Sequence, residues 1–147
     1  MCQIHNNRVP KGKDIIAYKV FFVKDNQLYT PYQCFQMEVG ILYDTGTYET
    51  LTNVAISEGF FHSFKNLEDA TSFVKTSIKQ SKELYCAQRD YRIIKVFIPN
   101  SCETDLVYKG EFEAFAFEKD KYIDYFFETY ASNQVKLLEE VYVPEIQ

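Results

Sequence analysis

Few residues of this chain have side chains suited to acid–base or nucleophilic chemistry, and His62 is the first of them to consider. It lies in the run GFFHSF (59–64), whose side chains alternate with the two-residue spacing of a strand. A helix is predicted to begin directly afterwards, and the free amides of a helix start can bind an anion. The place of His62 between two phenylalanines favours a packed residue that is held by one hydrogen bond. The alternative is a ligand site at this strand-to-helix junction, with Tyr18, Lys19, His62, Ser63 and Asn66 as its candidate residues.

The cysteines and the other histidine are far apart in the sequence, so they could bind a metal only if folding brought them together. Cys2, Cys34, Cys86 and Cys102 contain no C-x-x-C pair. Cys2 and His5 have the one metal-like spacing, and they supply two of the four ligands that structural zinc requires. We therefore expect no metal site and a flexible N-terminal tail, with Cys2 and His5 as weak metal candidates. A Cys–His nucleophilic pair stays open, because such partners meet in space and not in sequence.

Paired carboxylates are the other group that could do acid–base chemistry. Glu139 and Glu140 are adjacent in a predicted strand and so face opposite ways, which prevents them from sharing a proton. Glu111 and Glu113 share a face, but on a strand that is predicted to be exposed. Solvated roles are expected for both pairs. The chain also lacks the phosphate-binding, zinc-protease and hydrolase motifs that would fix a reaction.

The composition is that of one globular domain with an unusual number of aromatic side chains. The 147 residues include 13 Phe and 12 Tyr but no Trp, which suits a β-rich core and leaves open an aromatic-lined pocket or partner surface. The net charge of −5 argues against bulk nucleic-acid binding. Basic residues gather in residues 1–24 and acidic residues in 103–128. The acidic segment indicates either a solvated face or a surface for a basic partner.

No segment is predicted to enter a membrane. No stretch approaches the roughly 18 apolar residues of a spanning helix, and the start lacks the apolar region of a signal peptide. A cytoplasmic protein with reduced cysteines and no membrane partner is therefore expected.

The elements that must position these residues are read from hydrophobic patterning. Residues 15–23 predict a central strand, and residues 91–99 predict another strong strand. Further strands are predicted over 28–35, 37–43, 106–117 and 132–144, and 118–130 is ambiguous between helix and strand. Pro31 moves the strand at 28–35 to an edge or a bulge. Asn66 is a good N-cap for an amphipathic helix over about residues 66–80.

Together these patterns predict an α+β fold with a mainly antiparallel, curved sheet of about five to seven strands packed against one principal helix. Residues 1–14 are predicted to be an N-terminal tail and entry loop, and residues 15–147 a single domain.

The order and spacing of four segments resemble the layout of small ADP-ribosyltransferase domains. These segments are IIAYKVF (15–21), FFHSFKNLEDATSFV (60–74), IIKVFIP (93–99) and ASNQVKLLEEVYV (131–143). In that family the first strand carries an Arg or His for the nicotinamide dinucleotide, the middle segment a Ser-Thr-Ser on its strand or a Tyr-bearing helix, and the last strand a catalytic Glu. By position the resemblance implies Lys19, Ser63 and Glu139 or Glu140 for these roles. The chain departs from the family at Lys19 and in having His-Ser-Phe at the middle motif.

The chain also resembles small proteins of gut Bacteroidetes and their phages, a group to which no activity is assigned. The shared features are Cys2-x-x-His5-Asn6, the first strand, the GFFHSF element and a YASN run at 130–133. We therefore expect a small cytoplasmic binding module for a protein partner or a small ligand, phage or mobile-element associated, with no cofactor and no catalysis. The alternative is an ADP-ribosyltransferase-like enzyme, active or degenerate, and only this alternative implies nicotinamide dinucleotide.

Overall fold

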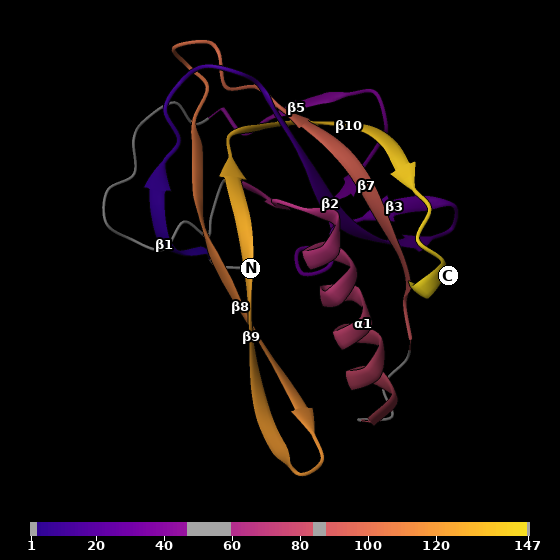
Figure 1. Ribbon diagram of the computed structural model, residues 1–147. Helices are drawn as coiled ribbons and strands as arrows, with labels where there is room; N and C mark the ends of the chain where they lie inside the picture. The colour runs from indigo at the N-terminus through magenta and orange to yellow at the C-terminus, as the bar shows by residue number, and fades with distance from the viewer. Residues whose placement is uncertain (1–2, 47–59, 84–87, 147) are drawn as a thin grey trace.

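In the part of the chain that it describes, the computed structural model shows one α-helix packed against a ten-stranded sheet in which every strand ladder is antiparallel (Figure 1). It describes residues 3–46, 60–83 and 88–146. The α+β class and the antiparallel sheet are confirmed, but ten strands exceed the predicted five to seven. The elements are β1 (Gln3–Arg8), β2 (Ile15–Lys24), β3 (Gln27–Tyr29), β4 (Gln36–Met37), β5 (Leu42–Asp44), β6 (Phe61–Phe64), α1 (Leu67–Glu83), β7 (Asp90–Ile98), β8 (Val107–Glu118), β9 (Lys121–Ser132), β10 (Gln134–Val141) and the short 3-10 helix η1 (Pro144–Ile146).

The extra strands arise where the sequence pattern is short or polar. The predicted strand 28–35 ends early, because Pro31 follows β3 and the chain turns through Cys34, which has a left-handed φ of 56°. The predicted strand 37–43 is divided between the short strands β4 and β5. The ambiguous segment 118–130 is extended and forms most of β9.

The predicted N-terminal tail also contains a strand. β1 has a polar sequence, yet it pairs with β8. The Gln3 side chain is fully buried, and its amide nitrogen donates to the carbonyl oxygens of Tyr108 and Thr129 at 3.2 and 2.9 Å. Buried hydrogen bonds of this kind replace the apolar contacts by which a strand is usually recognised.

The sheet consists of two groups of strands joined at β6 and β2. The spatial order is β1-β8-β9-β6-β2-β7-β10-β5. β2 and β7 pair along nine residues each, whereas β2 and β6 meet at the single pair Tyr18 and Phe64. β2 and β6 therefore diverge beyond this pair, and no ladder of backbone hydrogen bonds joins them there.

The core lies on both faces of the sheet. On one face, α1 covers an aromatic-rich cluster in which the ring of Phe73 lies 5.2 to 6.1 Å from those of Phe64, Phe112 and Phe127. On the other face the curving sheet and its edge segments cover an aliphatic cluster that contains Ala17, Phe21, Met37, Ile94, Val96, Ile98, Val107, Val135 and Leu137. Each fully buried large apolar side chain contributes about 1.5–3 kcal/mol, so the sheet is fixed from both sides.

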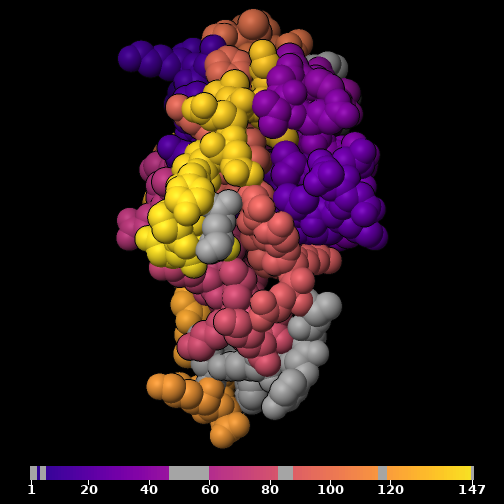
Figure 2. Space-filling model, turned by 90° about the vertical axis from the view of Figure 1, so that its right-hand side faces the viewer, coloured from indigo at the N-terminus to yellow at the C-terminus, as the bar shows by residue number. Residues whose placement is uncertain are grey.

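The predicted helix over about residues 66–80 is confirmed as α1, three residues longer at its end. Asn66 precedes it, and its side-chain oxygen accepts a hydrogen bond from the Asp69 amide at 2.8 Å. Ala70, Phe73 and Val74 are buried beneath the helix as its apolar spacing predicts. The C-terminal segment ending in η1 packs along the same helix (Figures 1 and 2).

Candidate functional site

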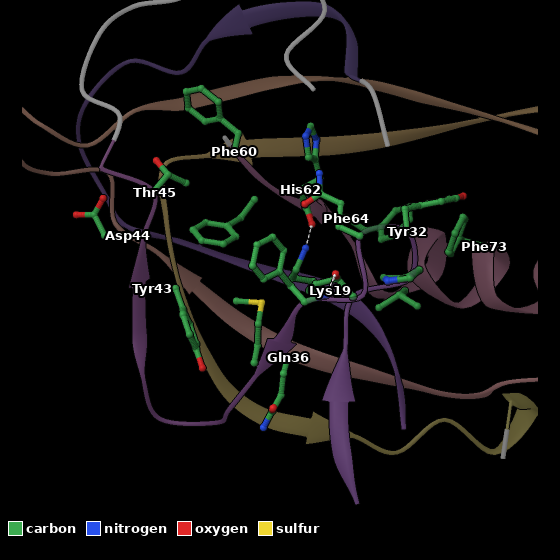
Figure 3. Close-up of a pocket in the computed structure, with 17 residues that line it drawn as sticks. Lys19, Tyr32, Gln36, Tyr43, Asp44, Thr45, Phe60, His62, Phe64 and Phe73 are labelled. Atoms are coloured by element: carbon green, nitrogen blue, oxygen red, sulfur yellow. Dashed lines mark hydrogen bonds between the residues drawn. The ribbon is translucent and has the colours of Figure 1, made fainter. Parts of the chain in front are cut away.

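A pocket of about 950 Å³ lies where β2 and β6 separate (Figure 3). The two strands, the segment between β3 and β4, the end of β5 and one residue of α1 form its walls. Most of its lining is apolar or aromatic. The lining residues are Lys19, Val20, Thr30, Pro31, Tyr32, Gln33, Phe35, Gln36, Met37, Tyr43, Asp44, Thr45, Phe60, Phe61, His62, Phe64 and Phe73.

Lys19 is the basic residue of this lining, and it is only 7% exposed. Its ammonium donates a hydrogen bond of 2.7 Å to the backbone carbonyl of His62 (Figure 3). Because β2 and β6 have already diverged there, the lysine side chain supplies the donor that a paired strand would otherwise provide. The ammonium also lies 5.8 Å from the centre of the Phe21 ring.

The charge of Lys19 is poorly compensated by the protein. Within the part of the chain that the structure describes, no carboxylate forms an ion pair with it. Burial lowers its pKa from 10.5 to about 8. At neutral pH the side chain is therefore still mostly an ammonium, and it presents a positive charge to an apolar pocket.

The wall opposite β6 is held by hydrogen bonds within the segment that connects β3 to β5. The Thr30 hydroxyl accepts from the Phe35 amide at 2.9 Å, and the Tyr43 hydroxyl accepts from the Glu38 amide at 2.7 Å. These contacts fix a loop in which Tyr32 and Phe35 are both more than half exposed. Aromatic side chains are thus available at the pocket without being part of the core.

The structure places two of the five predicted ligand residues, Lys19 and His62, in this pocket. His62 is buried as well as pocket-lining, so the two interpretations of this residue describe the same position. Figure 3 shows that its backbone carbonyl faces Lys19, whereas its imidazole points away from the ammonium. His62 therefore positions Lys19 through the main chain and not through its ring.

The other three predicted residues lie outside the lining. Tyr18 neighbours Lys19 on β2 and therefore faces the opposite side, where it packs against the aromatic cluster beneath α1. Ser63 is completely buried on β6. Asn66 caps the helix, and the carboxylate of Asp69 accepts a hydrogen bond from the Glu128 amide at 3.2 Å. The helix start is thus engaged with its own cap and with β9.

The residues implied by the transferase resemblance are not assembled into one site. β7 lies between β2 and β10 and pairs with both, so no cleft separates the strand of Lys19 from the strand of the two glutamates. Glu139 lies 4.0 Å from the Lys95 ammonium and Glu140 lies 3.2 Å from the Arg92 guanidinium, and their side chains are 70% and 47% exposed.

The weak metal candidates fall largely outside the described residues. Cys2 and Cys86, and the side chain of His5, are not among them. Cys34 and Cys102 are exposed, free thiols. Within residues 3–46, 60–83 and 88–146, no helix combines the length and apolarity needed to cross a membrane.

Sequence reasoning missed the wall formed by the segment between β3 and β5. The sequence predicts a weak strand over residues 28–35, but Tyr32 and Phe35 lie in the loop between β3 and β4. An irregular, proline-containing run with exposed aromatic residues is a signal for a binding loop. The buried position of Lys19 also had a signal, because this lysine interrupts an otherwise apolar strand.

Comparison of the chain with protein-family models, with curated proteins and with solved structures finds no match.

Proposed function

We propose that this chain is a binding module that holds a small, mostly apolar molecule with one anionic group in the pocket at Lys19. The observation that carries the proposal is a buried ammonium in an aromatic-lined pocket with no ion-pair partner among the described residues. A ligand carboxylate or sulfonate would supply this partner, and the charge-assisted hydrogen bond would be strengthened by the apolar surroundings.

The size and lining of the pocket suit such a ligand. Its volume of about 950 Å³ lies within the range of small-molecule sites, which are mostly apolar with few polar groups. Phe60, Phe61 and Phe64 would contact the apolar body of the ligand on the β6 side. Tyr32 and Phe35 would contact it from the loop on the other side.

The energetics of Lys19 also favour a binding role over a purely structural one. A pKa lowered from 10.5 to about 8 corresponds to a cost of roughly 3 kcal/mol at neutral pH. The hydrogen bond to the His62 carbonyl does not restore the pKa of Lys19 to its ordinary value. A residue that lowers stability in a binding pocket is typical of a functional position.

A titration with anilinonaphthalene sulfonate tests the proposal, because this fluorescent dye joins an aromatic body to an anionic group. We expect one saturable site per chain and at least tenfold weaker binding to Lys19→Met. Lys95→Met is the matched control. Lys95 lies on the neighbouring strand opposite Tyr18 and is outside the pocket lining. Equal binding by all three proteins, or several weak sites in each, would overturn the proposal.

A further inference from the structure

Part of β8, in the β8–β9 hairpin, has an open edge as far as the described residues show. β1 pairs with β8 only as far as the pair Gln3 and Phe112, whereas β8 continues to Glu118. Among the residues that the structure describes, no strand pairs with this edge beyond Phe112. Figure 1 shows the end of the hairpin extending past the rest of the sheet, beside α1. An open edge of this kind can accept an additional strand.

The hairpin turn determines which backbone groups face this edge. Lys119 and Asp120 both have left-handed φ values, 49° and 65°, which are typical of a two-residue type I′ turn. In such a hairpin the flanking residues Glu118 and Lys121 exchange hydrogen bonds, and every second residue of β8 then does the same with β9. The N–H and C=O groups of the alternate residues Glu113 and Phe115 therefore point to the open edge.

A groove of about 570 Å³ lies along the same edge. Glu113, Ala114 and Phe115 line it from β8, and no described residue of β9 does. The opposite wall is the side of α1 that carries Ser77 and Gln80. The groove thus has the strand edge on one side and a helix on the other.

Aromatic rings provide the apolar part of this groove. Tyr32 lies 6.4 Å from the ring of Phe73 and 6.3 Å from that of Phe112, and all three residues line the groove. Arg89 also lines it, and its guanidinium lies 4.2 Å from the Phe22 ring and donates to the Pro31 carbonyl. Apolar side chains of an added strand would fit here better than cationic ones.

The outer face of the hairpin favours cationic side chains of an added strand over apolar ones. The β8–β9 register places Glu111, Glu113, Asp124 and Glu128 on this face together with Phe115 and Phe126. The two phenylalanines are 58% and 56% exposed. Lysine or arginine side chains of an added strand would pair with the carboxylates and contact the phenylalanine rings.

We propose that the open edge of β8 binds an extended segment of a partner protein as an added strand, with apolar residues alternating with Lys or Arg. The apolar residues enter the groove beside α1, and the basic residues lie over the acidic outer face. A second copy of this chain is a poorer occupant, because edge-to-edge pairing would bring the Glu113 carboxylates of two copies together. The groove shares Pro31, Tyr32 and Phe73 with the pocket at Lys19, but Lys19 and β6 do not line it, and the proposal does not depend on the small ligand.

The test uses a labelled ten-residue peptide of alternating Val and Lys, titrated against the full chain by fluorescence anisotropy. We expect saturable binding, with amide shifts in NMR spectra at Glu113 and Phe115. A peptide of alternating Val and Glu is expected to bind at least tenfold more weakly. Binding of both peptides with equal affinity would overturn the proposal.

Two substitutions at one position separate backbone pairing from charge. Glu113→Pro removes an edge N–H and the carboxylate, so we expect a loss of at least tenfold. Glu113→Gln removes the carboxylate alone, and a loss of about twofold to fivefold is expected. Circular dichroism confirms that each variant is folded, and Lys19→Met should bind the peptide like the parent chain. Undiminished peptide binding to Glu113→Pro would contradict the proposal of an added strand from a partner protein. A dimer of the parent chain that Glu113→Pro dissociates would contradict it as well.

Discussion

At the scale of single residues, Lys19 is the residue whose position needs an explanation beyond folding. Its ammonium is buried in an apolar pocket with one hydrogen-bond acceptor, the backbone carbonyl of His62. The desolvation that lowers its pKa also lowers the stability of the fold at neutral pH. An apolar side chain of similar length would avoid this cost, although it would leave the His62 carbonyl without that donor.

The depressed pKa predicts a specific pH dependence of stability. Between about pH 8 and the unfolded value of 10.5, the unfolded chain keeps the Lys19 proton and the native chain does not. The free energy of unfolding of the parent chain should therefore rise with pH relative to that of Lys19→Met. We expect the difference to change by roughly 2 kcal/mol between pH 7 and 9.5, measured by urea denaturation. Parallel curves for the two proteins would show that Lys19 is not buried as described.

Sequence alone could indicate some of this site but not its geometry. Lys19 and His62 were among the predicted residues, and the structure brings both to one pocket. Asn66 and Ser63 were predicted beside them because they are close in sequence. Neither lines the pocket, because Asn66 caps α1 and the Ser63 side chain is completely buried in β6.

At the scale of elements, the well-predicted segments are those whose pattern is long and strongly apolar or clearly amphipathic. β2, β7 and α1 belong to this group, since each is long and its apolar residues follow the pattern expected of a buried strand or an amphipathic helix. β4 has two residues, so it offers no period to read. β1 is polar and is recognised only through its partner β8.

β10 contains one extra residue, and this bulge changes which of its side chains share a face. Its odd-numbered residues were predicted to share a face from Val135 to Val143. The register shifts between Leu137 and Glu139, so Leu137 packs in the aliphatic cluster whereas Val141 packs against the cluster beneath α1. A bulge of this kind depends on the neighbouring strand, and a single sequence does not reveal it.

The helix cap gives a prediction at this scale. Asn66→Ala removes the acceptor of the Asp69 amide and should lower the free energy of unfolding by about 1 kcal/mol. Asn66→Ser keeps an oxygen at the cap and should retain most of the stability. Urea denaturation of the two variants measures the difference. If serine costs as much as alanine, the cap does not stabilise α1 as the structure indicates.

At the scale of the whole molecule, the pocket is a consequence of strand order. β6 is far from β2 in the sequence, and the two meet at one residue pair before diverging. The segment from β3 to β5 then returns to the same place and completes the wall. These are long-range arrangements, so the class of fold could be predicted from the sequence but the site could not.

The acidic hairpin is also a property of the whole molecule. The sequence showed an acidic segment over 103–128 without indicating whether it was a solvated face or a partner surface. The β8–β9 register gathers four of its carboxylates and two exposed rings on one side, and among the described residues no strand covers the β8 edge beside them. The molecule thus has two candidate recognition surfaces, a pocket at Lys19 and an edge at β8.

The most direct test of the central claim is a calorimetric titration with a naphthalene carboxylate and its neutral amide, against the parent chain and Lys19→Met at pH 7. The two ligands share an apolar body and differ in the charge that Lys19 is proposed to bind. We expect the parent chain to prefer the carboxylate by roughly tenfold to a hundredfold, and Lys19→Met to show no preference. Equal affinities in the parent chain, or a carboxylate preference that survives in Lys19→Met, would contradict the account.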